Sequence, residues 1–232
     1  GYAWDAAGNL TLREERNRGV REQFYYDNRD RLDYVVRGGS VVLDLGYDNI
    51  GNLTYKSDVG TYRYDPYRKQ AAVAAGANTY SYDANGAVTS ASGTTIAWLS
   101  HDLPRQIAHP GGNYSSFDYG PDRARYRQVA SAGGVQTETV YAAGGLYERV
   151  TSGGVTRERS YIVADGRRVA VQTRQVGTAP TTVYLLEDQL GGVDGFTSSS
   201  GALLSRASYQ PFGARRSGDW LGGSPTPSEW QQ

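Results

Sequence analysis

A motif that recurs about every 20 residues constrains the fold of this chain more than any other feature of its sequence. Each of its five copies has an aromatic residue followed by Asp, and four copies have an aliphatic residue five positions after that Asp. A period of this length suits two strands and two turns. The copies cover residues 4–10, 26–32, 47–53, 64–67 and 82–88.

The residues that follow each aromatic are typical of a tight hairpin turn. Asp at the first turn position can accept hydrogen bonds from backbone amides further along, and Gly three residues later tolerates a positive φ. Asp30 takes the Gly position in the second copy, and Pro66 fits the second position of a type I turn. We therefore predict structural turn roles for Asp5, Gly8, Asp27, Asp48, Gly51, Asp65, Asp83 and Gly86.

The rest of the chain also has the pattern of strands and turns. Two weaker copies of the motif surround Asp102 and Asp122. Segments rich in β-branched and aromatic residues then alternate with Gly pairs, and no segment has a helical period. The predicted strands are 136–141, 146–151, 155–163, 168–176 and 181–186. The sequence predicts an all-β fold, an antiparallel ribbon of hairpins with little or no helix.

Composition favours a thin sheet over a domain with a thick core. Hydrophobic residues make up 38% of the chain, below the roughly 45–50% of an average globular domain. The 19 Tyr residues can stabilise a thin sheet through cross-strand pairs. Of the 24 basic residues only Lys56 and Lys69 are lysines, and Arg guanidinium groups stack on Tyr rings and pair bidentately with Asp.

Charge and hydropathy exclude several classes of partner. The net charge is zero and no long run of one sign occurs, so we expect no nucleic-acid partner. No apolar run reaches the ~18–20 residues of a membrane span. The chain contains no Met, and we therefore expect Gly1 to be an internal residue of a longer polypeptide.

The residues that could carry catalysis are few and poorly arranged. His101 and His109 are eight positions apart in a turn-rich stretch, which is not a metal-ligand spacing. The carboxylate pairs Glu14-Glu15 and Glu187-Asp188 are adjacent, so on a strand their side chains would point to opposite faces. We expect no catalytic residue, no cofactor and no metal site in this chain.

Surface aromatics and three glycosylation sequons leave a binding function open. Two sequons, at Asn9 and Asn52, belong to the hairpin motif, so turn geometry explains them without glycans. The third is at Asn113. Exposed aromatics beside Arg could form an extracellular glycan- or protein-binding, adhesive surface, which we keep as an alternative function.

The Tyr-Asp-x-x-Gly-Asn-Leu copies resemble the YD repeats of Rhs proteins, insecticidal toxin-complex subunits and teneurins. Four motifs further along are similar, in order and spacing, to the bacterial Rhs-associated core: 119–127, 145–148, 188–192 and 209–216. The family's Asp-x-Leu-Gly-Ser ends here in Gly192, which removes a hydroxyl from that position. The core-motif residues that we single out are Asp188, Leu190, Gly191, Tyr209, Pro211, Phe212 and Gly213.

The resemblance implies a domain organisation. It predicts a YD-repeat hairpin region over 1–128 and core-like hairpins over 129–219. The Gly, Pro and Ser residues of 220–232 predict a linker-like tail. The resemblance also implies that the ribbon spirals as part of a hollow shell around a toxic C-terminal effector, in a bacterial protein that is secreted or delivered by a secretion system.

The resemblance also implies partners and a second alternative function. The expected partners are the rest of the parent polypeptide, the enclosed effector, and a cell-surface glycan or protein. In the family, aspartates further along the chain are implicated in self-cleavage. The second alternative is thus a self-cleaving aspartyl protease whose catalytic residues lie beyond Gln232, and this chain would be its non-catalytic part.

Overall fold

The computed structural model describes residues 1–220 as an all-β chain, which confirms the predicted antiparallel hairpin ribbon. Strands β1–β21 belong to a 21-stranded antiparallel sheet, and β22 and β23 form a separate pair. The only helical turns in the described part are three 3-10 segments, Arg16–Arg18, Pro110–Gly112 and Ala143–Gly145. No helix there is long and apolar enough to cross a membrane. Of the predicted tail 220–232, all but residue 220 lies outside the described residues.

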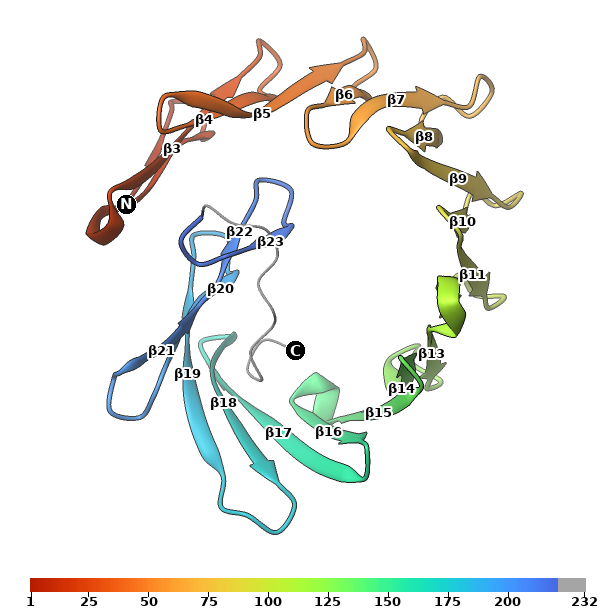
Figure 1. The fold of residues 1–232 in the computed structure, drawn as a ribbon, viewed down its shortest axis with the longest axis vertical. Helices are drawn as coiled ribbons and strands as arrows, with labels where there is room; N and C mark the ends of the chain where they lie inside the picture. The colour runs from red at the N-terminus through yellow and green to blue at the C-terminus, as the bar shows by residue number, and fades with distance from the viewer. Residues whose placement is uncertain (221–232) are drawn as a thin grey trace. The chain divides into compact units, whose positions relative to one another are not determined.

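The chain divides into two compact units, Gly1–Thr95 and the part from Ile96 onward. Within the first unit each strand pairs with its neighbours in sequence, and successive hairpins lie side by side in Figure 1. Its strands are β1 (Tyr2–Trp4), β2 (Leu10–Glu15), β3 (Val20–Tyr26), β4 (Leu32–Arg37), β5 (Ser40–Tyr47), β6 (Leu53–Lys56), β7 (Gly60–Tyr64), β8 (Ala72–Ala75), β9 (Asn78–Tyr82) and β10 (Val88–Ala91). Strand β11 (Thr94–Trp98) begins at the end of this unit.

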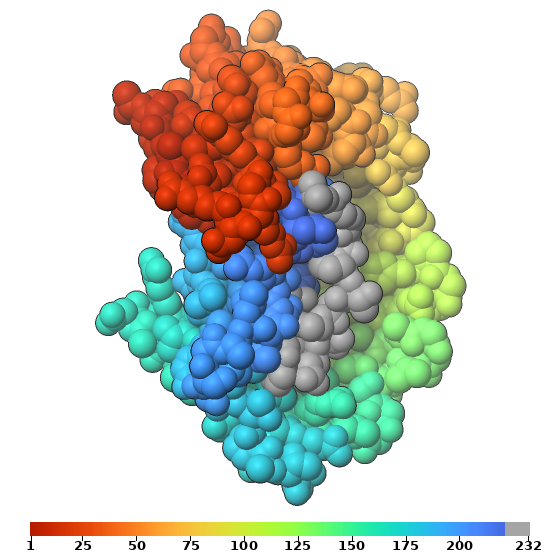
Figure 2. Space-filling model, turned by 60° about the vertical axis from the view of Figure 1, so that its left-hand side comes forward, coloured from red at the N-terminus to blue at the C-terminus, as the bar shows by residue number. Residues whose placement is uncertain are grey.

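The second unit continues the same sequential pairing with longer strands. The five strands predicted for its middle correspond to β15–β19, with ends that differ by one residue or less. Figure 2 shows the later strands of this unit in light and dark blue. Residue 128, the predicted end of the YD-repeat region, lies within β14. The strands are β12 (Pro104–Ala108), β13 (Tyr114–Tyr119), β14 (Arg125–Ala132), β15 (Val135–Ala142), β16 (Tyr147–Ser152), β17 (Val155–Ala164), β18 (Arg167–Gln175), β19 (Thr181–Glu187), β20 (Val193–Thr197), β21 (Leu203–Arg206), β22 (Ser208–Tyr209) and β23 (Arg215–Arg216).

The motif turns share one hydrogen-bonding pattern, which the turn at Asp48 illustrates. Its Oδ1 accepts the backbone amides of Ile50 (3.0 Å) and Asn52 (2.8 Å). The Asp48 amide donates to the Asn52 carbonyl, and the Gly51 amide donates to the Asp48 carbonyl. Gly51 has φ 96°, a conformation that glycine adopts without steric cost. This geometry is a type I turn followed by a bulge, and the strand register shifts beside Tyr47.

Three other motif turns repeat this pattern, and one departs from it. The Oδ1 atoms of Asp5, Asp27 and Asp83 each accept the amides two and four residues further on. Asp30 takes the Gly position of its turn with φ 57°. Asp65 instead accepts the amides of residues 67 and 68, and its own amide donates to the carbonyl of Ala71. Pro66 therefore lies in a longer loop than the other copies have.

Where the aromatic residue of a motif is a tyrosine, it connects its turn to an earlier one. The Tyr47 hydroxyl, at the end of β5, donates to the carbonyl of Leu32, the first residue of β4, at 2.9 Å. Six such Tyr-to-carbonyl bonds, of 2.7–3.1 Å, occur in the described residues, each to the first residue of the preceding return strand. The pairs are Tyr26–Leu10, Tyr47–Leu32, Tyr64–Leu53, Tyr82–Ala72, Tyr119–Pro104 and Tyr209–Val193. We call this series the tyrosine ladder.

The turn tips of the first unit are also joined to one another. The Asn9 side-chain amide donates to Asp30, and the Asn52 amide donates to the Lys69 carbonyl at 2.8 Å. Arg29 and Arg68 donate to the carbonyls of the following tips, each at 3.0 Å. Each pair of successive tips is thus connected at the edge as well as along the strands.

The apolar cores are small, as the composition predicts. In the first unit Phe24, Val35, Leu43 and Leu45 form one buried cluster, and in the second Val171, Val183 and Phe196 form another. Beside the first cluster, Glu22 is 1% exposed and binds Arg13 at 2.6 Å, with Arg37 at 3.5 Å. Two guanidinium groups thus pair with the buried Glu22 carboxylate. A carboxylate buried at this depth without such partners would strongly destabilise the fold.

We predict that Tyr47→Phe lowers the free energy of unfolding by about 1 kcal/mol, because the Leu32 carbonyl loses a donor while the ring and its packing remain. Tyr67→Phe is the matched control, because the Tyr67 side chain is 93% exposed. Urea unfolding followed by circular dichroism measures both. Equal stability of the two variants would contradict a stabilising role for the ladder.

We also predict that the protein loses stability in acid. The Arg31 side chain, with the Arg31 and Arg29 amides, lowers the pKa of Asp27 to about 2, whereas an unfolded Asp has a pKa of about 3.9. The stability from this carboxylate is therefore present above about pH 4 and is lost as the pH falls toward about 2. Between about pH 4 and about pH 2, the melting temperature of Asp27→Asn should decrease less than that of the unchanged protein.

Candidate functional site

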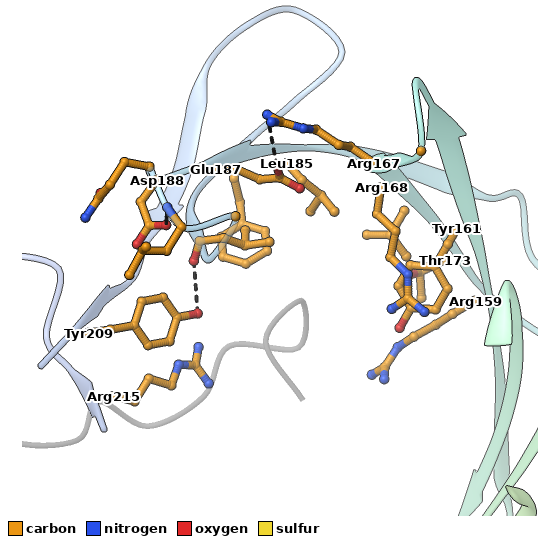
Figure 3. Close-up of a pocket in the computed structure, with 17 residues that line it drawn as sticks. Arg159, Tyr161, Arg167, Arg168, Thr173, Leu185, Glu187, Asp188, Tyr209 and Arg215 are labelled. Carbon is orange, nitrogen blue, oxygen red and sulfur yellow. Dashed lines mark hydrogen bonds and ion pairs between the residues drawn. The ribbon is translucent and has the colours of Figure 1, made fainter. Parts of the chain in front are cut away.

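Four of the seven core-motif residues of the sequence analysis line one cavity in the second unit. The cavity has a volume of about 1050 Å³, and Asp188, Leu190, Gly191 and Tyr209 contribute to its lining (Figure 3). Residues 211–213 (Pro211, Phe212 and Gly213) are not in the lining and lie in the turn between β22 and β23. The structure thus brings two motifs together that are about 20 residues apart in sequence.

Asp188 is the turn residue of a further copy of the repeat. Its Oδ1 accepts the backbone amides of Leu190 and Gly192, each at 2.9 Å. The Asp188 amide donates to the Gly192 carbonyl at 2.7 Å, and the Gly191 amide donates to the Asp188 carbonyl at 3.1 Å. These are the bonds of the Asp48 turn. Asp188 therefore has the same structural duty as the aspartates of the first unit.

Tyr209 belongs to the next copy along this edge of the ribbon. Its hydroxyl donates to the carbonyl of Val193, the first residue of β20, at 3.1 Å (Figure 3). The turn after it has the same backbone bonds, from Gln210 to Ala214 and from Gly213 to Gln210, with Gln in place of Asp. One bond of the tyrosine ladder, from Tyr209 to Val193, therefore joins the two motifs around the cavity.

The sequence analysis missed these two copies as repeats. Glu187 replaces the aromatic residue in the first, and Gln210 replaces Asp in the second. A third unrecognised copy has Ser198, whose Oγ accepts the amides of Ser200 and Ala202. The signal that could have found all three is Gly three residues after the turn residue, at positions 191, 201 and 213.

Guanidinium groups and carboxylates face the cavity. Arg168 donates to the Gly145 carbonyl at 3.0 Å, and its guanidinium lies 4.2 Å from the centre of the Tyr161 ring. Burial raises the pKa of the Tyr161 hydroxyl. Glu187 lies 3.7 Å from Arg167. In Figure 3, Arg159 and Arg168 lie on one side of the cavity, across from Tyr209 and Arg215.

The residues weighed for catalysis do not come together. His101 packs edge-on against the Tyr119 ring, and the His109 amide closes a turn by donating to the Asn113 carbonyl. Glu14 forms an ion pair with Arg16, and Glu15 is the last residue of the same strand, β2. Among the described residues, no group of three or more His, Cys, Asp or Glu side chains could hold a metal ion.

The asparagines of the three sequons are engaged in local hydrogen bonds. The Asn9 side-chain amide donates to Asp5 and Asp30, each at 3.1 Å. The Asn52 amide donates to Asp48 at 2.9 Å, and the Asn113 side-chain oxygen accepts the amide of Gly133 at 3.0 Å. These side chains connect turns to one another.

Comparison with known proteins gives fold-level similarity alone. No family model matches the chain, and no curated protein matches it. Among solved structures, the chain is similar to TcdB2-TccC3-TEV (TM-score 0.49) and TcdB2-TccC3-Cdc42 (TM-score 0.47), with 14% identity to each. It is also similar to the Photorhabdus luminescens Tc holotoxin pore with the TccC3-D651A mutation, at TM-score 0.47 and 14% identity. In each case 93% of this chain is covered, and it spans about 16%, 16% and 15% of those chains, respectively.

We predict that a side chain at position 192 disturbs the junction between the Asp188 turn and Tyr209. A Cβ there would lie 3.2 Å from Oδ2 of Asp188 and 3.3 Å from Cε2 of Tyr209. Gly192→Ala should therefore lower the free energy of unfolding by roughly 1 kcal/mol, through crowding. When Tyr209 is first replaced by Leu, Gly192→Ala should lower the free energy of unfolding by less. An equal loss with and without the Tyr209 ring would contradict the predicted crowding against that ring.

Proposed function

We propose that this chain is a non-catalytic wall segment of a larger Rhs-type polymorphic toxin protein, which encloses or presents a C-terminal effector. The observation that carries the proposal is the tyrosine ladder, because four successive motif turns of the first unit are each connected by it to the preceding turn through a specific bond. The YD-repeat likeness of the sequence supports the family in this proposal, and the ladder supplies a physical reason for the Tyr-Asp pairs.

The bonding pattern suits a wall. Backbone pairing joins neighbouring strands, the ladder adds a side-chain bond between the ends of such neighbours, and side chains such as Asn9 and Asn52 join the tips. These three sets of bonds act in the plane of the sheet, so the ribbon gains stability without a thick core on either face. A barrier between an effector and its surroundings needs this lateral continuity.

The polar side chains favour a structural role over an enzymatic one. The turn aspartates use an oxygen to hold two backbone amides, and Asp188 does the same at the cavity. In this proposal any self-cleavage would depend on residues of the parent beyond this chain. The partners are then the rest of the parent polypeptide and its effector, in a bacterial protein that is secreted or delivered by a secretion system.

Limited proteolysis of the full-length parent tests the proposal. We predict that the segment downstream of this chain resists trypsin, and that the triple variant Tyr26→Phe, Tyr47→Phe, Tyr64→Phe exposes it to faster cleavage, because three ladder bonds are lost. The matched control replaces three exposed tyrosines, Tyr67, Tyr126 and Tyr184, by Phe. Mass spectrometry of the fragments gives the cleavage rates.

Two outcomes would contradict the wall function. One is a downstream segment that trypsin cleaves as fast within the parent as when it is expressed alone. The other is a parent with no downstream domain that nevertheless binds glycans through exposed aromatics such as Trp4 and Tyr67, which would favour the adhesive alternative.

A further inference from the structure

We propose that the cavity between β17–β20 and the β22–β23 hairpin is a binding site for an acidic peptide segment. This inference goes beyond the wall function and does not depend on it. Both walls come from the second unit, so the site is complete within one compact part of the chain.

The charge of the lining points to an anionic ligand. Four arginines contribute to it, Arg159, Arg167, Arg168 and Arg215, against two carboxylates, Glu187 and Asp188. Glu187 lies near Arg167, Glu148 lies 3.7 Å from Arg159, and one oxygen of Asp188 already accepts two backbone amides. The cavity therefore has an excess of positive charge that a carboxylate-bearing ligand would complement.

Arg168 is the best placed of these groups to receive a carboxylate. Among the described residues its guanidinium contacts a carbonyl, that of Gly145, and the ring of Tyr161, and neither neutralises its charge. The stacked ring limits the freedom of the guanidinium before any ligand arrives, so less entropy is lost when a carboxylate binds. Arg159 lies on the same side of the cavity in Figure 3.

The remaining lining favours a peptide over a simple anion. Val171 and Phe196, each 4% exposed, and the half-buried Leu185 and Val193 form an apolar floor for a side chain. The Oε1 atom of Gln189 is buried and has no hydrogen-bond partner among the described residues, and a peptide N–H could donate to it. Protein-recognition surfaces are enriched in arginine and aromatic residues, and arginine clusters bind acidic motifs.

Fluorescence anisotropy with a short, capped, fluorescein-labelled peptide of alternating Glu and Tyr tests the site in the full 232-residue chain. We expect saturable binding that weakens as salt is added, because charge pairs contribute to it. Arg168→Gln should raise the dissociation constant about tenfold, since a charge-assisted hydrogen bond is lost. Arg168→Lys should give an intermediate value, because it keeps the charge without the planar fork.

Controls separate the site from general charge effects and from unfolding. Arg105→Gln removes one positive charge at an exposed position of β12 outside the cavity and should leave binding unchanged. Thermal melting identifies any variant that fails to fold, and Arg159→Gln then serves as the second variant, with the same expected direction. A peptide of alternating Lys and Tyr should not bind.

Three results would overturn the proposal. The first is no saturable binding of the Glu-Tyr peptide near physiological salt. The second is binding that Arg105→Gln and Arg168→Gln weaken equally. The third is preferential binding of an acidic oligosaccharide, such as oligogalacturonate, which would assign the cavity to another class of ligand.

Discussion

The structure depends on one interaction, the acceptance of two backbone amides by a single carboxylate oxygen of the turn aspartate. At Asp48 this bond fixes a five-residue turn and places the bulge beside Tyr47. The bulge in turn sets the end of the strand, from which the tyrosine hydroxyl reaches the carbonyl of Leu32. Turn chemistry, strand register and the connection between hairpins therefore follow from the same carboxylate.

The tyrosine ladder explains why aromatic residue and Asp recur together. A tyrosine one position earlier or later would point to the other face of its strand and miss the carbonyl. Tyr82 keeps its bond to Ala72 although the loop after Asp65 is longer than the other turns. The ladder thus tolerates a variable tip, provided that the return strand begins beside the next tyrosine.

The sequence predicted the fold class and most strands because turn signals and alternating residues are local. It did not reveal the copies at Asp188, Ser198 and Gln210, where one or two signature residues are replaced while the glycine and the backbone bonds remain. The ladder bonds join residues 10 to 16 positions apart, and the cavity joins Arg159 to Arg215. Such contacts arise from pairing between strands, which no local pattern encodes.

Each ladder bond reaches back by one hairpin and no further, and this range has an evolutionary consequence. A chain coupled only to its nearest neighbours behaves as a one-dimensional array, whose energy is close to a sum of unit and junction contributions. Duplicating or deleting one hairpin of about 20 residues then changes the length of the array while every remaining junction stays intact. A gene encoding such units can therefore grow or shrink in small steps without a new hydrophobic core at each step.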